Sequence, residues 1–322
     1  MAFDPASLRQ TWAPPRRPLP IVTIGAGSIV MDAHFPAYRK GGFPIAGVFD
    51  LNAERAKLVG EKFGVRVFGS LDEALSTDRA IFDLATPPSA HLSALERLPS
   101  GAGVVIQKPM GSDLDEATAI LMACRERKLK AAVNFQLRFS PMTLAIKDAA
   151  DRGLLGRLVD VETSVSIDTP WALFAFLKNL PRIESAVHSI HYLDLIRSFL
   201  GDPSGVHAKT IGHPSSEMAQ TRTAAILDLG DEVRSAMSVN HNHAYGRRHQ
   251  VAEFRFEGTE GAAHAKMGCS STIRAASPTS SPSRPRARRR GSPSRCAAAG
   301  SPTPSSARWP TCNGSSRERI PS

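Results

Sequence analysis

The sequence has few cysteines and no long hydrophobic segment. Its 322 residues include four cysteines, and their spacing fits neither a disulfide framework nor a zinc site, which favours a reducing compartment. There is no run of about 18 uncharged apolar residues, so no membrane-spanning helix is expected. Residues 1–20 lack the apolar stretch of a secretory signal and contain several prolines and arginines instead. We therefore expect a cytoplasmic protein with no membrane partner.

Charge is nearly balanced outside the C-terminal segment. The last 55 residues, 268–322, carry ten Arg and one acidic residue, so they hold +9 of the total formal charge of +10. This segment is rich in Ser, Pro and Ala and has few large apolar side chains, which predicts disorder because burial cannot offset the ordering entropy. Clustered arginines at 284–295 would bind phosphate only non-specifically, and no aromatic side chains interleave with them. No specific nucleic-acid partner is expected.

The length predicts about two domains. We divide the chain into a Pro/Arg-rich arm (1–20), a nucleotide-binding domain (21–135), a second domain (136–267) and a disordered tail (268–322). Residues 21–135 alternate short β-rich runs with helical patterns, which is typical of a doubly wound α/β domain with a parallel sheet. The expected strands are 21–24, 45–49, 65–68, 80–85, 104–106 and 130–135. Helices are expected at 28–38 and at 53–63, where Asn52 is the predicted cap. A third is expected to begin at the capping pair Asp113 and Glu116.

The pattern changes after Gln136. Helices are expected at 141–152 and 186–200, and strands at 158–167, 205–211, 221–229, 233–240 and 251–256. Consecutive strands without intervening helices predict a mostly antiparallel sheet, hence an α+β fold for the second domain.

A glycine-rich turn follows the first expected strand. It consists of Gly25, Ala26, Gly27, Ser28, Ile29 and Val30. Gly25 permits a tight turn, Gly27 permits close approach of a pyrophosphate, and the helix that follows presents N–H groups to the anion. Val30 occupies the third glycine position of the fingerprint, and we expect it to loosen helix–strand packing.

Asp50 ends the second expected strand, 23 residues after Gly27. An acidic residue here is suited to the ribose hydroxyls of NAD and would repel the 2′-phosphate of NADP. Arg55, one helical turn beyond, leaves NADP as an alternative. The competing interpretation is an ordinary strand–turn–helix with a surface aspartate.

Two further loops follow strands of the same expected sheet. Thr86 and Pro87 end the fourth strand, with His91 nearby, and Gln107 and Lys108 end the fifth. In open α/β sheets ligands bind at the carboxyl edge. Each loop alone is equally consistent with a plain turn and a solvated lysine.

His188 and His191 lie one turn apart on an expected helix, with Asp194 one further turn along. Imidazole accepts a proton at neutral pH, as alcohol oxidation requires. No third ligand has convincing spacing for a metal, so no metal is expected, and a pair of partly buried histidines is the alternative. Trp171, Phe174, Phe176 and Arg182 precede this helix and either line a pocket or pack between domains.

Taken together, residues 21–267 resemble the glucose–fructose oxidoreductase / inositol dehydrogenase / rhizopine-catabolism (Gfo/Idh/MocA) family. The resemblance rests on the segments GAGSIV, VFDLNAERA, ATPP, QKPMG, NFQLRFSP, GLLGRLVDVE and HSIHYLDLIRSFLGDP. It implies a Rossmann domain that carries NAD, with NADP as the alternative. It also implies a second domain whose open sheet forms the substrate wall and, if complete, a homo-oligomer interface. The implied substrates are sugars, cyclitols or related polyols.

The resemblance also implies residue roles. Lys108 would contact both cofactor and substrate, with Gln107 where relatives have Glu. His191 would be the acid/base, with Val187 where relatives have Asp and His188 as a substitute polar group. The implied cofactor contacts are Gly25, Gly27, Ser28, Ile29, Asp50, Arg55, Thr86, Pro87, His91, Gln107 and Lys108.

Two alternatives follow from the departures. A nucleotide-binding relative without turnover would explain Gln107, Val187 and the unusual tail. The tail itself has the composition of a GC-rich gene translated out of frame, which predicts a frameshift near Gly268, whereas a genuine basic tail is the alternative. A frameshift would leave the second sheet incomplete.

Overall fold

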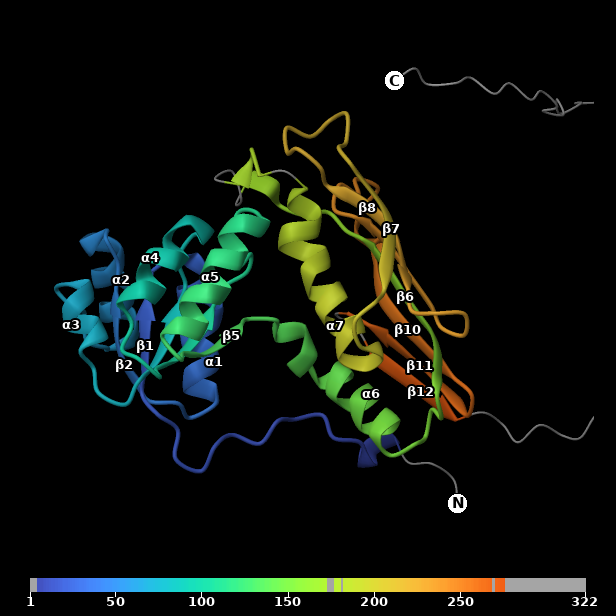
Figure 1. Cartoon of the computed structure of the whole chain (residues 1–322), viewed down its shortest axis with the longest axis horizontal. Coiled ribbons are helices and arrows are strands. Elements are labelled where there is room, and N and C mark those ends of the chain that lie inside the picture. The colour runs from blue at the N-terminus through green and yellow to red at the C-terminus, as the bar shows by residue number, and fades with distance from the viewer. Residues whose placement is uncertain (1–4, 173–176, 181, 268–269, 276–322) are drawn as a thin grey trace, which may run out of the picture. The chain divides into compact units, whose positions relative to one another are not determined.

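A computed structural model describes residues 5–172, 177–180, 182–267 and 270–275. Within these residues the chain forms a five-stranded and a seven-stranded sheet (Figure 1). The predicted fold class, a parallel α/β sheet followed by a mostly antiparallel α+β sheet, is confirmed. The part of the predicted tail from 276 onward lies outside the described residues, as do Phe174 and Phe176.

The first sheet is entirely parallel, with strand order β2-β1-β3-β4-β5. Its strands are β1 (Ile21–Ile24), β2 (Ile45–Phe49), β3 (Ile81–Leu84), β4 (Gly103–Ile106) and β5 (Lys130–Val133). The predicted strand at 65–68 is wrong. This segment makes one isolated bridge, between Val67 and Val48. Val48 exchanges two backbone hydrogen bonds with Arg66 and Phe68, and the chain then leaves the sheet edge before a strand can form.

Helices connect these strands, as the sequence pattern predicts. They are η2 (Val30–His34), α1 (Phe35–Lys40), α2 (Ala53–Phe63), α3 (Leu71–Leu75), η3 (Pro88–Ala90), α4 (His91–Arg97) and α5 (Leu114–Glu126). The Asn52 side chain accepts a hydrogen bond from Arg55 N, and Asp113 accepts one from Glu116 N, so both predicted caps form. The helix expected at 28–38 begins at Ser28 as predicted, passes through a π-helical turn, η2, and ends at Lys40.

Val30 does not loosen the packing, contrary to expectation. Its side chain is fully buried in a cluster with Phe35, Val48, Val59 and Phe63. The isopropyl group fills space between helix and sheet that a glycine would leave to other side chains.

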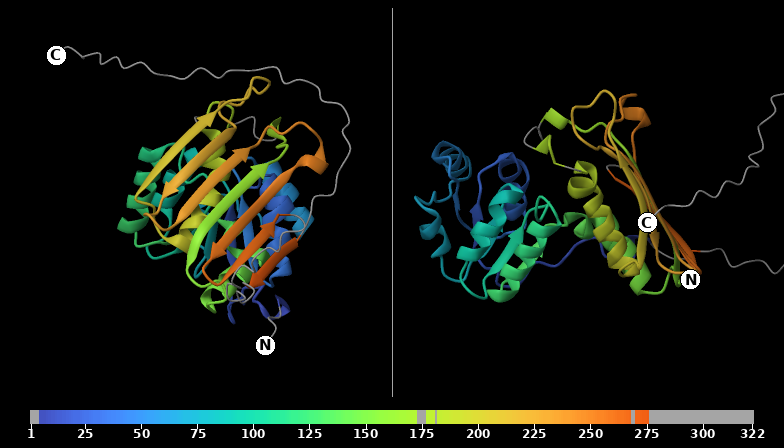
Figure 2. Two further views of the ribbon diagram at one scale, coloured as in Figure 1. Left: turned by 90° about the vertical axis from the view of Figure 1, so that its right-hand side faces the viewer. Right: turned by 45° about the horizontal axis from the view of Figure 1, so that its top comes forward.

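The second sheet has strand order β12-β11-β10-β6-β9-β8-β7, and Figure 2 shows its strands side by side. They are β6 (Leu158–Ser166), β7 (Gly205–Ile211), β8 (Arg222–Asp228), β9 (Arg234–Asn240), β10 (Val251–Gly258), β11 (Gly261–Lys266) and β12 (Ser270–Ala275). The accompanying helices are η4 (Gln136–Phe139), α6 (Pro141–Asp151), η6 (Ser185–Ser189), α7 (Ile190–Leu200) and η7 (Arg247–His249).

Two features of this sheet differ from the expectations. The central pair β6 and β9 is parallel. The strands β7 and β8 lie between them in the sequence but beyond β9 in the sheet, so the chain enters β9 in the same direction as β6. The strand β12 falls inside the segment predicted to be disordered, where backbone pairing with β11 supplies hydrogen bonds that the composition does not reveal.

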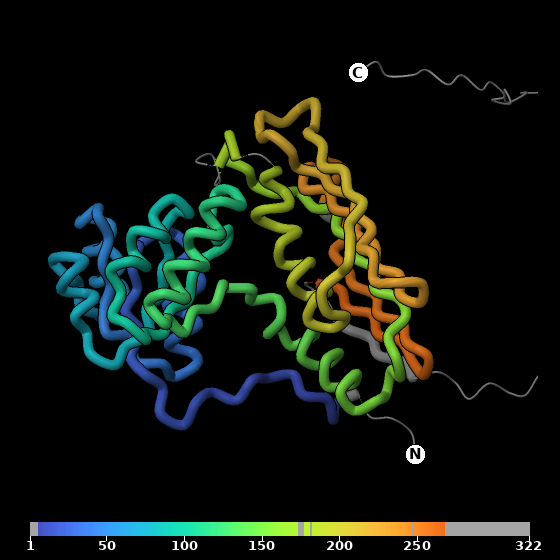
Figure 3. Tube along the Cα trace, in the orientation of Figure 1, coloured from blue at the N-terminus to red at the C-terminus, as the bar shows by residue number. Residues whose placement is uncertain are grey.

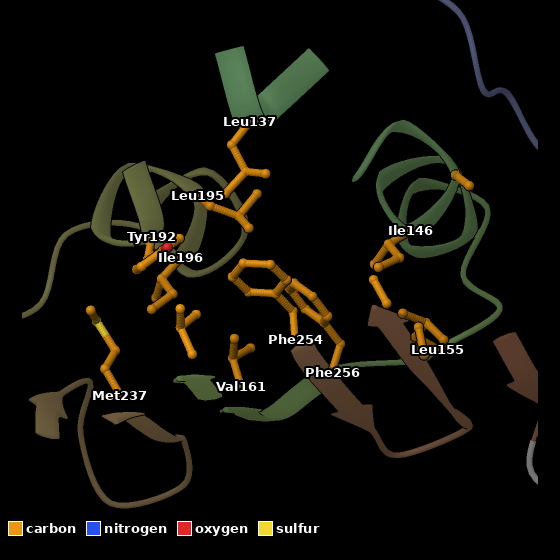
Figure 4. Close-up of a cluster of buried hydrophobic side chains, with 14 of the residues drawn as sticks. Leu137, Ile146, Leu155, Val161, Tyr192, Leu195, Ile196, Met237, Phe254 and Phe256 are labelled. Atoms are coloured by element: carbon orange, nitrogen blue, oxygen red, sulfur yellow. The ribbon is translucent and has the colours of Figure 1, made fainter. Parts of the chain in front are cut away.

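One core joins the helices α6 and α7 to the second sheet. Leu195 and Ile196 of α7 point toward Phe254 and Phe256 of β10 (Figure 4). Alternation along β10 puts both phenylalanines on the helix-covered face, as period-two patterning requires. The N-terminal arm, the dark blue start of the tube in Figure 3, adds to this core through Leu8, which follows η1 (Pro5–Ser7) and is buried.

No helix among the described residues is long and apolar enough to cross a membrane.

The buried position of Val30 leads to a stability prediction. We expect Val30→Ala to lower the free energy of unfolding by about 2 kcal/mol, because two buried methyl groups are removed from a packed cluster. Leu58→Ala is the control, since Leu58 is 58% exposed and the change should stay within about 0.5 kcal/mol. Urea unfolding of the three proteins measures both values, and equal losses would contradict the packing role of Val30.

Candidate functional site

The glycine-rich turn joins β1 to η2 at the carboxyl edge of the first sheet. Gly25 has a φ of +105°, and a Cβ there would lie 2.4 Å from the Ala85 carbonyl oxygen, so the fold itself requires glycine. A Cβ on Gly27 would meet no described atom within 4 Å. The described fold therefore does not require glycine at position 27, and the space beside it is open. Ser28 and Ile29 are exposed in the first turn of the helix that follows.

Asp50 lies directly beside this turn. One carboxylate oxygen accepts a hydrogen bond from Ala26 N at 2.7 Å and the other from Asn52 N at 2.7 Å. The side chain is half-buried, and Arg55 is exposed in the first turn of α2. The turn and a carboxylate thus share one edge, as a dinucleotide site requires.

The residues present fit a bound NAD. Gly27 leaves an open cradle before a helix N-terminus, and that helix has exposed Ser28 at its start. Asp50 is held by two backbone N–H groups, which fixes its carboxylate next to the cradle.

His91 ties together the two loops that follow β3 and β4. Its Nε2 lies 3.0 Å from the Thr86 carbonyl oxygen and its Nδ1 lies 3.0 Å from that of Met110. The ring is fully buried, and burial lowers its pKa. His91 therefore joins the loop of Thr86 and Pro87 to the loop that carries Lys108 and Met110.

Gln107 belongs to a buried hydrogen-bond network that sequence analysis missed. Its side-chain nitrogen lies 3.3 Å from His34 Nε2, and His34 Nδ1 lies 2.8 Å from an Asp83 carboxylate oxygen. The same oxygen accepts hydrogen bonds from the Tyr38 hydroxyl and Thr23. Because the amide donates to Nε2, His34 donates from Nδ1 to Asp83. The buried carboxylate of Asp83 on β3 is thus linked through His34 to Gln107, the position where the resemblance implies a glutamate.

Lys108 and the two predicted histidines influence one another. Burial lowers the pKa of Lys108. Burial lowers the pKa of His191 to about 4, with Lys108 contributing and Asp194 opposing. The pKa of His188 is lowered to about 2, chiefly by burial and further by electrostatic repulsion from His241, Lys108 and His191. Both imidazoles are therefore neutral at pH 7, and the half-buried Lys108 contributes to this.

Asp194 and Val187 have structural partners. Asp194 is buried and holds Arg138 of η4 through two hydrogen bonds, one from Nη2 at 2.6 Å. Val187 is buried in an apolar cluster with Leu177, Ile183 and Met218. The position where relatives have Asp is thus part of the packing here.

Sequence analysis also missed three polar residues that surround His188. They are Glu184, Thr169 and His241, all buried. His241 directly follows β9, and only the parallel pairing with β6 brings it to Thr169; no spacing in the sequence indicates this. Trp171 contacts both His188 and His241 edge-on, whereas Arg182 is exposed. In the described part of the chain no three His, Cys, Asp or Glu side chains form a metal-binding group.

Comparison with known proteins points to one family. Residues 19–135 match the Gfo/Idh/MocA family, described as an oxidoreductase family with an NAD-binding Rossmann fold. A UDP-N-acetylglucosamine 3-dehydrogenase of Acidithiobacillus ferrooxidans is 35% identical over 106 residues, which are 33% of this chain and 34% of that protein. An inositol 2-dehydrogenase of Rhizobium meliloti is 26% identical, covering 58% of this chain and 54% of that protein. The chain thus spans about a third to a half of these curated relatives.

Solved structures share the fold of both sheets. An oxidoreductase of Agrobacterium radiobacter in complex with NAD+, L-tartaric acid and magnesium superposes with a TM-score of 0.68 at 23% identity, covering 81% of this chain and 80% of that one. The WlbA dehydrogenase of Bordetella pertussis in complex with NADH and UDP-GlcNAcA has a TM-score of 0.69 at 21% identity, covering 82% and 79%.

The two glycines of the turn are predicted to respond differently to alanine. Gly25→Ala should destabilise the fold by about 2 kcal/mol or more, because of its φ and the close carbonyl. Gly27→Ala should leave the free energy of unfolding within about 0.5 kcal/mol of the unmodified chain. It should weaken NADH binding at least about tenfold, since the methyl group would occupy the space proposed for the pyrophosphate. Urea unfolding and NADH fluorescence titration measure the two effects, and tight NADH binding by Gly27→Ala would contradict the assignment.

The buried histidines predict an acid-sensitive stability. His188, His191 and His241 have folded pKa values of about 2, 4 and 4, below the ordinary 6.5, so the unfolded chain binds more protons. Stability is fully present above pH 6.5 and falls below it by up to about 1.4 kcal/mol per pH unit for each group. Urea midpoints between pH 7 and 5 measure this slope. A flat profile would contradict the burial of these rings, and His213→Asn, at a histidine outside this cluster, should leave the slope unchanged.

Proposed function

Residues 19–135 belong to the Gfo/Idh/MocA family of NAD-binding oxidoreductases, and on this premise we propose that the chain transfers hydride between NAD and a sugar, cyclitol or related polyol. The observation that carries the proposal is the glycine-rich turn with the Asp50 carboxylate anchored beside it, at the edge of the sheet that also carries the half-buried Lys108. Lys108 follows β4, and the glycine-rich turn follows β1 in the same parallel sheet. Amine, imidazole and nucleotide cradle are the parts that a polyol dehydrogenase needs.

In the proposed reaction His191 takes the proton of the substrate hydroxyl. The pKa of His191 is lowered to about 4, so the ring is neutral and able to accept a proton at pH 7. Lys108 donates a hydrogen bond to the same substrate oxygen and stabilises its developing negative charge. NAD, when bound, supplies the hydride acceptor at its nicotinamide ring.

Burial and a neighbouring carboxylate affect these two roles. Desolvation lowers the pKa of Lys108, which reduces the cost of bringing its amine close to the cationic nicotinamide ring. After proton transfer, the carboxylate of Asp194 supports the charged His191 electrostatically, as its opposing contribution to the His191 pKa indicates. Asp194 is itself fixed by Arg138.

The preference for NAD is proposed from Asp50. Its carboxylate is anchored beside the turn by Ala26 N and Asn52 N, so it would face the ribose hydroxyls and repel a 2′-phosphate. Arg55 is exposed on α2 and is the group that would favour NADP.

Substrate and assembly are proposed at the level of chemical class. Relatives include an inositol dehydrogenase and a sugar-nucleotide dehydrogenase, which supports a polyhydroxylated substrate. The exposed Val206 of β7 and Ile226 of β8 support a homo-oligomer formed through the second sheet. A cytoplasmic location is the setting we propose for such an enzyme.

Lys108→Ala tests the proposal. We expect turnover to fall by a factor of about 10² to 10⁴ while NADH affinity stays within about threefold, since Lys108 acts on the substrate oxygen. Turnover is measured as NAD reduction with a panel of neutral polyols and sugars that begins with myo-inositol. Lys128→Ala, at a lysine outside the site, is the matched control. Unchanged turnover in Lys108→Ala would contradict the assignment. Saturable NADH binding without turnover of any panel member would favour the nucleotide-binding protein without activity.

A further inference from the structure

His241 lies against one of the two predicted site histidines. Its ring and that of His188 are stacked, with centroids 3.9 Å apart and planes inclined by 19°. His241 is 1% exposed and follows β9, whereas His188 lies in η6. The contact therefore joins the sheet to the helix that carries the predicted acid/base.

The sheet holds His241 from two sides. Its Nδ1 lies 2.7 Å from the Thr169 hydroxyl, and its carbonyl oxygen accepts a hydrogen bond from Trp171 Nε1 at 2.9 Å. Thr169 and Trp171 follow β6, which pairs with β9 in parallel. An isolated bridge between Asp168 and Asn242 continues this pairing beyond the strands. The ring is thus fixed before any substrate binds.

Glu184 lies behind the stacked pair. It precedes η6, is fully buried, and accepts a hydrogen bond from the Ser189 hydroxyl at 2.7 Å. The same carboxylate oxygen lies 3.9 Å from His241 Nε2, beyond hydrogen-bond range. Burial raises the pKa of Glu184. His188 therefore stacks on His241 and contacts Trp171 edge-on, and its pKa is also influenced by Lys108 and His191.

We propose that His241 is a positioning residue, whose stacked ring holds His188 beside Lys108 and His191 so that His188 orients the substrate while His191 exchanges the proton. Two rings 3.9 Å apart oppose charging of either one, and His241 is among the causes that lower the pKa of His188. His188 is then a permanently neutral hydrogen-bonding group. The division of roles between the two histidines rests on the proposed function, whereas the stacking effect on His188 does not.

Histidine side-chain NMR of the full chain tests the stacking effect. The variants are His241→Phe, which keeps a flat ring, His241→Ala, which removes it, and His249→Ala as the control at an exposed histidine. His188 signals are assigned with His188→Asn. We expect His188 to stay neutral down to pH 5 in the unmodified chain, in His241→Phe and in the control. In His241→Ala its pKa should rise by about one unit or more, as water enters and a neighbouring ring is lost.

Two outcomes of the NMR experiment would overturn the proposal. One is a His188 titration in His241→Ala that matches the unmodified chain. The other is a His241→Phe variant that titrates like His241→Ala, because ring stacking would then be irrelevant. If His241→Ala does not fold, Thr169→Val replaces it: it releases the Nδ1 tether without a large cavity and should shift the titration in the same direction.

Kinetics test the division of roles. With the best substrate of the polyol panel, we expect His241→Ala to raise KM at least about tenfold with kcat within about threefold, because ground-state orientation is lost. His241→Phe should restore KM. A fall in kcat at unchanged KM would overturn the role of His188 in orientation. Absence of turnover in the unmodified chain would contradict the proposed function alone, since the NMR result stands without it.

Discussion

The carboxyl ends of parallel strands meet at one edge of a sheet, and both sheets of this chain depend on that constraint. In the first sheet it gathers the turn at Gly25, the carboxylate of Asp50 and the amine of Lys108, which follow three different strands. In the second sheet the parallel pair β6 and β9 gathers Thr169 and His241 in the same way. Polar groups far apart in the chain thereby become neighbours without any long loop.

Desolvation then sets the chemistry of these groups. It is the largest cause of the lowered pKa values of Lys108, His188, His191 and His241. The imidazoles are therefore neutral at pH 7, and the pKa values of His188 and His191 are lowered further by the half-buried Lys108. The same burial makes the fold sensitive to acid, because each ring must remain uncharged as long as it is enclosed.

Two departures from the family pattern have counterparts in the structure. Gln107 replaces a glutamate, and its amide donates to His34, which in turn contacts the buried carboxylate of Asp83. Val187, at the position where the resemblance implies an aspartate, packs in an apolar cluster, while the neighbouring His188 stacks on His241.

The sequence by itself determined the fold class, most strands within a residue or two, the caps at Asn52 and Asp113, and the candidate groups from Gly25 to His191. These follow from local periodicity and turn chemistry, which each segment carries alone. The strand order, the parallel pairing of β6 with β9, the pairing of β12 and the contacts of Asp83, Glu184 and His241 were decided only by the tertiary structure. One physical reason explains all of these features. Strand pairing and burial join residues from segments that are distant in the sequence, and no segment by itself specifies which other segment it will contact.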